Sequence, residues 1–196
     1  MTKLDLFIQS QRIDMARRFL RPGTRVLDLG CGDGALFKQI PEVWGVGIDP
    51  TLSAPIELPN AKLLPGRFPE DTATESEFDF VTMLASLEHL PRVVRSELGS
   101  GCYRALKPKG KVIITVPSAK TDILLSVLKT FHLIDGQSLE EHHGYDVNET
   151  PQVFSSLKMV LQKRFQLGFN NLFVFEKAEA TGAEVASQQL LNLKAS

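Results

Sequence analysis

The chain has 196 residues, of which 43% are hydrophobic and 23% are charged, and its formal net charge is −1. This length and composition favour one globular domain, and the near-neutral charge argues against a broad nucleic-acid-binding face. No apolar run reaches the roughly 18 residues that a membrane span needs. The first residues lack a signal-peptide layout, and two cysteines suggest no disulfide framework. We therefore expect a cytoplasmic protein.

The first predicted elements are an amphipathic helix over residues 4–20 and an apolar strand that ends on Asp28. Three glycines follow at alternate positions: Gly30, Gly32 and Gly34. A helix-like segment over residues 35–40 comes next. A strand that turns sharply into a helix needs glycine where φ is positive and where a ligand approaches the backbone. The helix N-terminus adds free N–H groups, so the pattern predicts a small-molecule site.

Two ligand classes use such a turn. Gly30, Gly32 and Ala35 also satisfy the G-x-G-x-x-A pattern of dinucleotide sites, so the glycines alone leave the choice open. Asp28 would lie beside the pyrophosphate of a dinucleotide, where two like charges cost on the order of several kcal/mol. A cationic ligand such as S-adenosylmethionine (SAM) would instead be attracted, and the sequence therefore favours SAM.

A second apolar strand, over residues 44–48, ends on Asp49. An acid roughly 20 residues after the glycine turn, at the end of the next strand, is placed to accept hydrogen bonds from both ribose hydroxyls of either ligand class. The alternative is that Asp49-Pro50 only opens a loop, because Asp before Pro favours turns.

The prolines within residues 50–59 argue against a crossover helix there, so we expect a loop or a single turn. A short strand over residues 62–64 and a nearly continuously apolar, central strand over residues 78–84 follow. Ligands in open α/β sheets bind beyond the carboxyl ends of the strands. Leu84 is therefore expected to face the same crevice as the glycine turn.

A helix over residues 92–106 and a strand over residues 111–116 precede an insertion at residues 118–149. Because this insertion follows the carboxyl end of a strand, we expect it to fold over the site as a lid and to suit a modest-sized acceptor. We assign residues 1–178 to one domain and residues 179–196 to a C-terminal tail.

The C-terminal part tests the topology. Thr150-Pro151 is a helix start, and its buried face is expected to extend to Val160 and Leu161. Strand-like runs over residues 164–169 and 172–177 then flank Asn170-Asn171. So short a link permits only antiparallel pairing, and a typical dinucleotide-binding sheet has no such hairpin.

Four segments carry a family resemblance: VLDLGCGDG, VGIDP, EFDFVTMLASLEHLP and ELGSGCYRALKPKGKVIITVPS. In order and spacing they resemble the Rossmann-like SAM-dependent methyltransferases of the small-molecule type. The resemblance implies an α/β fold with a doubly wound, mostly parallel, seven-stranded sheet and a C-terminal antiparallel hairpin. It also implies SAM as cofactor and methyl transfer to a small-molecule acceptor, by direct in-line displacement. In the family the helix over residues 4–20 packs over the cofactor; a helix packed on the sheet with solvated arginines is the alternative.

The residues expected to contact the cofactor are Asp28, Gly30, Cys31, Gly32, Gly34, Asp49, Pro50, Phe68 and Leu84. Family members often carry an acid where Arg67 stands, and that acid binds the adenine amino group. Arginine can only donate hydrogen bonds and cannot replace it. Adenine would then be held by backbone groups and by apolar contact with Phe68 and Pro50, or Asp71 would substitute.

The residues that would act on the acceptor are less defined. His89, His142 and His143 are candidate proton acceptors, because histidine titrates near neutral pH. No metal is expected, since the adjacent residues Glu140 to His143 cannot all converge on one ion. Two other functions stay open, a nicotinamide-dependent oxidoreductase and a SAM-binding assembly protein without catalysis, and the sequence does not define an oligomeric state.

Overall fold

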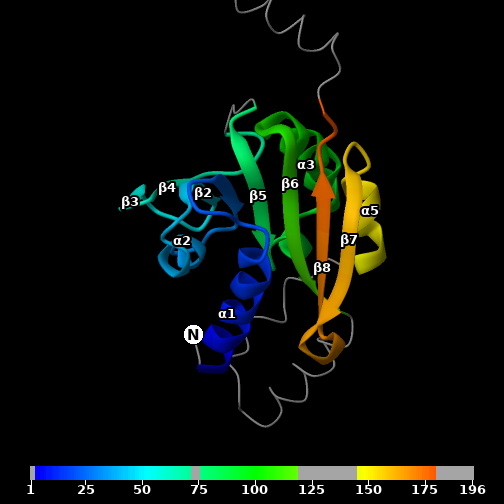
Figure 1. Ribbon diagram of the computed structural model, residues 1–196, viewed down its shortest axis with the longest axis horizontal. Helices are drawn as coiled ribbons and strands as arrows, with labels where there is room; N and C mark the ends of the chain where they lie inside the picture. Colours follow the sequence, from blue (N-terminus) through cyan, green and yellow to red (C-terminus); the bar gives the residue numbers. More distant parts are fainter. Residues whose placement is uncertain (1–2, 72–75, 119–144, 180–196) are drawn as a thin grey trace, which may run out of the picture.

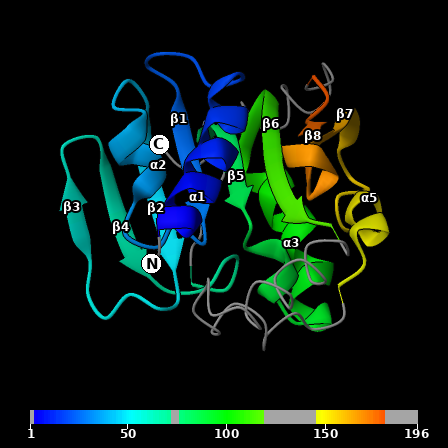
Figure 2. The same ribbon diagram turned by 90° about the horizontal axis from the view of Figure 1, so that it is seen from below.

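The computed structural model describes residues 3–71, 76–118 and 145–179, which form one eight-stranded sheet with helices on both faces (Figures 1 and 2). The strands are β1 (Arg25–Leu29), β2 (Trp44–Asp49), β3 (Ile56–Leu58), β4 (Ala61–Pro65), β5 (Phe78–Leu84), β6 (Leu106–Pro117), β7 (Lys158–Phe165) and β8 (Asn170–Glu176). The helices are α1 (Lys3–Arg17), α2 (Ala35–Gln39), α3 (Arg92–Ala105) and α5 (Thr150–Val153), with 3₁₀ turns η1 (Leu87–His89), η3 (Val147–Glu149) and η4 (Gln166–Gly168).

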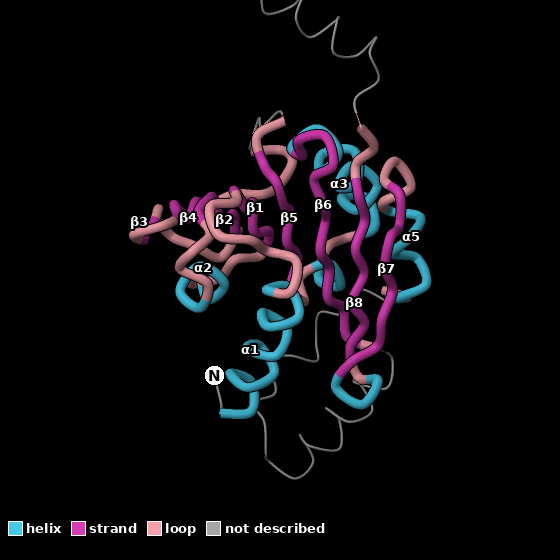
Figure 3. Tube along the Cα trace, viewed as in Figure 1, coloured by secondary structure: helices cyan, strands magenta, loops and turns pink. Residues whose placement is uncertain are grey.

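The sheet order is β3-β4-β2-β1-β5-β6-β8-β7, from one edge to the other in Figure 3. The five strands β4, β2, β1, β5 and β6 are parallel, and β3, β8 and β7 pair antiparallel to their neighbours. The predicted fold class, with its C-terminal antiparallel hairpin, is confirmed. Because β1 lies between β2 and β5, the carboxyl ends of these three strands meet at one edge of the sheet.

The strand number differs from the expected seven, because β3 forms where a loop or single turn was expected. Pro55 precedes this strand and Pro59 follows it, so neither proline stands where it would have to donate a ladder hydrogen bond. Three residues of an edge strand fit between them.

The C-terminal hairpin turns at a different place from the one predicted. The turn is η4, where Gln166, Leu167 and Gly168 all have positive φ, and Asn170 and Asn171 begin β8. The helix that starts at Thr150 is a single turn, and Val160, expected on its buried face, lies in β7 and is 43% exposed. β7 is an edge strand, so its apolar residues mark a half-covered sheet face and not the core side of a helix.

Buried side chains form one core on each face of the sheet. Residues of α1 and α2 pack on one face with Val26, Ile113 and Val174, and residues of α3 and α5 pack on the other with Val81, Ile114 and Phe175. The structure explains one glycine of α3 that propensity alone would disfavour. A Cβ on Gly99 would lie 1.9 Å from the Val153 carbonyl oxygen, so only glycine lets α3 pack against α5.

The domain limits of the sequence analysis stay predictions. Residues 119–144 of the predicted lid and residues 180–196 of the predicted tail lie outside the described residues. Among the residues that are described, no helix has both the length and the apolar character that a membrane crossing requires.

Candidate functional site

The carboxyl end of β1 carries a buried acid between two strands. Asp28 pairs in register with Gly47 of β2 and with Thr82 of β5, and only 4% of it is exposed. The Thr82 hydroxyl donates a hydrogen bond of 2.6 Å to the Asp28 Oδ1 atom. Burial raises the pKa of Asp28 to about 6; the Thr82 hydrogen bond opposes this rise, and the nearby Asp49 adds to it. At neutral pH this carboxylate is mostly charged in a poorly solvated place, an arrangement that favours a cation.

The glycines of the turn after β1 differ in their surroundings: some pack against neighbouring side chains, and one leaves space for a ligand. All three have positive φ, with values of 78°, 52° and 83° along the chain. A Cβ on Gly30 would lie 2.5 Å from the Cβ of Ser86, whose hydroxyl donates to the Leu29 carbonyl oxygen at 2.8 Å. A Cβ on Gly32 would meet no described protein atom within 4 Å. Gly32 is therefore the glycine of the turn that faces open space, where a ligand can approach its backbone.

Asp49 holds the glycine turn from the end of β2. Its Oδ2 atom accepts a hydrogen bond of 2.8 Å from the Gly32 N–H, and Oδ1 accepts from the N–H and the hydroxyl of Thr51, at 2.8 and 2.6 Å. The side chain is 7% exposed. Asp49 caps a turn through Thr51, as the loop interpretation predicts. It also lies beside Gly32 of the glycine turn, so its binding of the ribose stays a prediction. A carboxylate has about four acceptor positions, so it can add a ribose hydroxyl to these three donors.

The Cys31 side chain is buried beside Gly47 of β2. It is 6% exposed, and a Cβ on Gly47 would lie 2.6 Å from its sulfur. Burial, with smaller contributions from Asp28 and Asp49, raises the pKa of this thiol to about 12. Cys31 is therefore a protonated packing residue, and only its backbone remains for the predicted cofactor contact.

The predicted adenine side differs in detail from the expectation. Phe68 is 7% exposed, and its ring packs against α3, where a Cβ on Gly101 would lie 2.9 Å from the ring. Pro50 is exposed and Leu84 is half-buried. The Asp71 carboxylate accepts a hydrogen bond of 2.7 Å from the Arg67 N–H, so it closes the loop after β4. Of the two predicted adenine contacts, Pro50 thus offers more accessible apolar surface than Phe68 does, and Leu84 stays a predicted residue of the crevice at the end of β5.

The candidate residues for the acceptor are only partly described. His89 lies in η1, directly after β5, and is exposed. His142 and His143 lie outside the described residues. Within the described ranges, no three or more His, Cys, Asp or Glu side chains are grouped to hold a metal ion.

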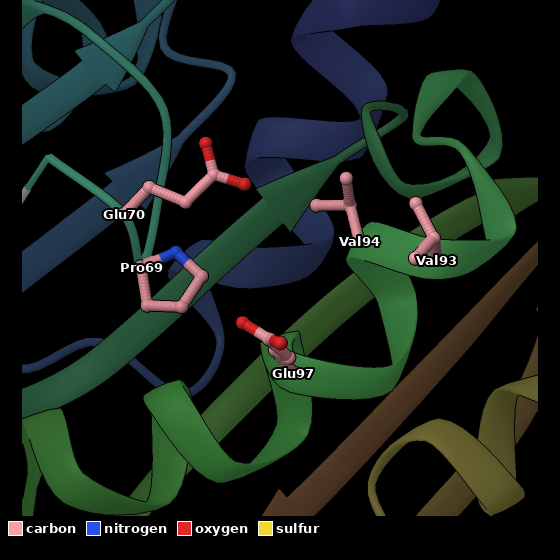
Figure 4. A pocket seen from close by; sticks show the side chains of 5 residues that line it. All are labelled: Pro69, Glu70, Val93, Val94 and Glu97. Atoms are coloured by element: carbon pink, nitrogen blue, oxygen red, sulfur yellow. The ribbon is translucent and has the colours of Figure 1, made fainter.

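A separate pocket lies between the loop after β4 and the start of α3, as Figure 4 shows. The residues that line it are Pro69, Glu70, Val93, Val94 and Glu97. None of them is a predicted cofactor residue, and none belongs to the glycine turn. We therefore place the candidate site at the carboxyl ends of β1, β2 and β5, where Asp28, Asp49 and the glycine turn lie, and not in this pocket.

Several residues of the site were missed from the sequence. Thr82 orients Asp28, Thr51 and Ser86 hold the loops on either side of the turn, and Arg12 of α1 is half-buried instead of solvated. The sequence did offer one signal for Thr82, since a hydroxyl side chain in the middle of an apolar strand needs a hydrogen-bond partner. Arg12 had no such signal, because its burial depends on a contact with residue 170.

Residues 5–164 match the family model described as the methyltransferase domain. The chain belongs to this family. Ubiquinone biosynthesis O-methyltransferases of Xanthomonas oryzae pv. oryzae are 34% identical over an alignment of 122 residues, which covers 54% of this chain and 46% of theirs. The chain thus spans about half the length of the curated relatives it matches.

Solved structures share the fold of this methyltransferase domain. A SAM-dependent methyltransferase from Methanosarcina mazei superposes with a TM-score of 0.62 at 17% identity, covering 85% of this chain and 98% of the other. The 1,6-didemethyltoxoflavin-N1-methyltransferase of Burkholderia thailandensis superposes with a TM-score of 0.64 at 14% identity, covering 88% and 79%. That structure contains 1,6-didemethyltoxoflavin and S-adenosylhomocysteine. The resemblance to Rossmann-like SAM-dependent methyltransferases is confirmed, with SAM as the cofactor of this domain, and the nicotinamide alternative loses its support.

Proposed function

We propose that this methyltransferase domain transfers a methyl group from SAM to a small-molecule acceptor by direct in-line displacement. The observation that carries the proposal is the buried Asp28 carboxylate, which accepts a hydrogen bond from Thr82 at the carboxyl end of β1, shortly before the glycine turn in which Gly32 faces open space. A cation gains from that carboxylate, whereas a diphosphate would be repelled by it. The glycine turn and Asp49 add donors and acceptors for the rest of the cofactor.

We assign the roles of the cofactor residues from their positions. Asp28 and the turn Gly30–Gly34 bind the amino-acid part, with Cys31 contributing its backbone only. Asp49 binds the ribose, Pro50 and the edge of Phe68 contact the adenine, and Leu84 lines the crevice. This division follows the order of the strand ends along the sheet, from β5 through β1 to β2 and β4.

SAM supplies an already activated methyl group, so the protein has little covalent chemistry to perform. The chain's own residues align the acceptor with the reacting carbon and exclude water from the path. A general base is required only where the acceptor keeps a proton at neutral pH. Of the three histidine candidates, His89 is the one that the structure describes, and it follows directly on β5.

An oxygen of a small metabolite is our preferred acceptor atom. The curated relatives are named as O-methyltransferases of ubiquinone biosynthesis, and they cover half of this chain. The B. thailandensis structure named above shares only the fold, so it does not favour nitrogen over oxygen.

The test combines binding and labelling. Isothermal titration is expected to show binding of S-adenosylhomocysteine and no binding of NAD. Incubation with methyl-labelled SAM and a cell extract is then expected to place the label in the low-molecular-weight fraction. Binding of NAD alone would refute the cofactor assignment. Label in nucleic acid or protein would refute a small acceptor, and cofactor binding without any label would favour the assembly protein.

A further inference from the structure

Thr115 and Gln166 each bury a polar atom that makes no hydrogen bond within the described part of the chain. The atoms are Oγ1 of Thr115, in β6, and Nε2 of Gln166, in η4. Thr115 as a whole is 0% exposed. A buried hydroxyl or amide without a partner costs free energy, so a folded protein that keeps one needs a reason for it.

Thr115 lies on the face of the sheet that also carries Asp28. Successive side chains of a strand alternate between the two faces, and Ile113, two residues earlier in β6, belongs to the core under α1 and α2. Leu84 of β5 is the register partner of Thr115 and packs against the same core. Asp28 shares this face, because Val26, two residues before it, is a member of that core too. Two strand spacings, about 10 Å, separate the strand of Asp28 from the strand of Thr115.

The start of β8 brings Gln166 to the same part of this face. β8 is antiparallel to β6, so its first residue, Asn170, lies opposite Pro117 at the carboxyl end of β6. Leu172, two residues further along β8, is the register partner of Thr115 and belongs to the α1-side core. Asn170 is therefore a diagonal neighbour of Thr115 on the same face, at about 7–8 Å between Cα atoms. The Asn170 amide nitrogen donates to the Gln166 Oε1 atom, which holds the Gln166 amide at this edge.

The two atoms without partners offer complementary hydrogen-bonding groups. A threonine hydroxyl donates one hydrogen bond and accepts others, whereas an amide nitrogen donates two. Together they provide more donors than acceptors, which matches an oxygen atom with two lone pairs. Both atoms are buried, so a ligand oxygen that reaches them meets little competition from water.

We propose that the Thr115 hydroxyl and the Gln166 amide nitrogen bind an oxygen function of the methyl acceptor, a hydroxyl or a carbonyl group. This inference rests on the proposed function and names the polar contacts that the acceptor makes there. The distance from Asp28 leaves room for the methyl group and one small molecule between them, as in-line transfer requires. Leu84 lies beside Thr115 and is only half-buried, so a change of its rotamer gives the acceptor access to the hydroxyl.

The test measures how tightly the protein holds its acceptor. Protein with saturating methyl-labelled SAM receives serial dilutions of the low-molecular-weight fraction of a cell extract. The extract concentration at half-saturation reports acceptor affinity, and the plateau rate reports turnover. Thr115→Val removes the hydroxyl and keeps the shape of the side chain, so it should raise the half-saturating concentration by about 3- to 10-fold, with a plateau within about twofold. Thr115→Ser keeps the hydroxyl and should stay within about twofold of wild type.

A variant of Gln166 tests the second contact. Gln166→Glu keeps the oxygen that accepts from Asn170 and replaces the amide nitrogen by an oxygen that cannot donate. It should raise the half-saturating extract concentration by about threefold or more. Thr24→Val is the matched control, since the Thr24 hydroxyl donates to the Arg21 carbonyl oxygen at 2.7 Å, just before the start of β1. This control should leave the half-saturating concentration unchanged.

Two further measurements separate acceptor binding from a structural role. Isothermal titration with S-adenosylhomocysteine should give affinities within about twofold of wild type for every variant, because the contacts belong to the acceptor. The urea midpoint of Thr115→Val should equal or exceed that of wild type, since valine removes a buried hydroxyl that has no partner in the unliganded protein. A clearly lower midpoint would mean that the hydroxyl already has a partner, and the proposal would then be wrong.

The inference is also overturned if Thr115→Val or Gln166→Glu keeps the wild-type half-saturating concentration. The same holds if Thr115→Val weakens S-adenosylhomocysteine as much as it weakens the extract titration, because the residue would then act on the cofactor. In each of these cases the wild-type protein still labels a small molecule, so the proposed function stands. A wild-type protein that labels no low-molecular-weight compound overturns the proposed function itself, and this inference with it.

Discussion

Replacing Asp28 by asparagine is expected to stabilise the unliganded protein and to weaken cofactor binding. The folded-state pKa of Asp28 is raised from 3.8 to about 6, mainly by burial. A raised acid pKa contributes stability that is fully present below the unfolded-state pKa and is lost as pH rises through the folded-state pKa. At 1.36 kcal/mol for each unit of pKa, this group costs the wild-type protein about 3 kcal/mol between pH 4 and pH 7.

Asparagine has nearly the same shape and carries no charge. Its amide oxygen can still accept the hydrogen bond that the Thr82 hydroxyl donates to Asp28 in the wild-type protein. The free energy of unfolding of Asp28→Asn should therefore exceed that of the wild type by about 1–3 kcal/mol at pH 7, and the two should converge below pH 4. Urea titrations of both proteins at matched pH values measure this difference in the free energy of unfolding, because the contributions of the other titrating groups cancel.

Cofactor binding is expected to change in the opposite direction. A cationic ligand requires the charged form of Asp28. With a pKa of about 6, the charged fraction falls from about ten elevenths of the molecules at pH 7 to about one eleventh at pH 5. Wild-type affinity for SAM should therefore fall about tenfold over this range, whereas the affinity of Asp28→Asn should be weak at both pH values. If Asp28→Asn is less stable than wild type at pH 7, or binds SAM equally well, the electrostatic reasoning is wrong.

Three further variants test the turn and the packing. Gly32→Val should abolish binding of S-adenosylhomocysteine, because its side chain fills the open side of the turn. Gly23→Val is its matched control, since both glycines have positive φ and open space where a Cβ would stand, and loss of binding in both variants would remove the assignment. Asp49→Ala should weaken S-adenosylhomocysteine binding by about 1–3 kcal/mol through lost hydrogen bonds to a charged group, and an unchanged titration would exclude the ribose role. Gly99→Ala should lower the free energy of unfolding by about 2 kcal/mol or more, since its Cβ would lie 1.9 Å from the Val153 carbonyl oxygen; an unchanged urea midpoint would show that α3 can move away.

The sequence by itself predicted the features that depend on neighbouring residues. Local backbone requirements and side-chain periodicity predict the glycine turn, the acids at the carboxyl ends of β1 and β2, and helix α3. The prediction of a parallel sheet with an antiparallel C-terminal hairpin is also correct, because a short link between two strands permits no other pairing. The link itself was placed wrongly, since Gln166 and Leu167 adopt positive φ that their residue types do not predict.

Only the tertiary structure decided which side chains of these elements face the site. Cys31 and Phe68 stand in segments predicted to bind the cofactor, yet their side chains pack into the two cores. Arg12 lies in an ordinary amphipathic helix and becomes half-buried through Asn170, which is 158 residues away along the chain. Burial and the pKa of Asp28 likewise depend on Thr82 and Asp49, contributed by neighbouring strands. Periodicity reports the direction of a side chain relative to its own backbone, whereas desolvation depends on partners that only the packed sheet brings together.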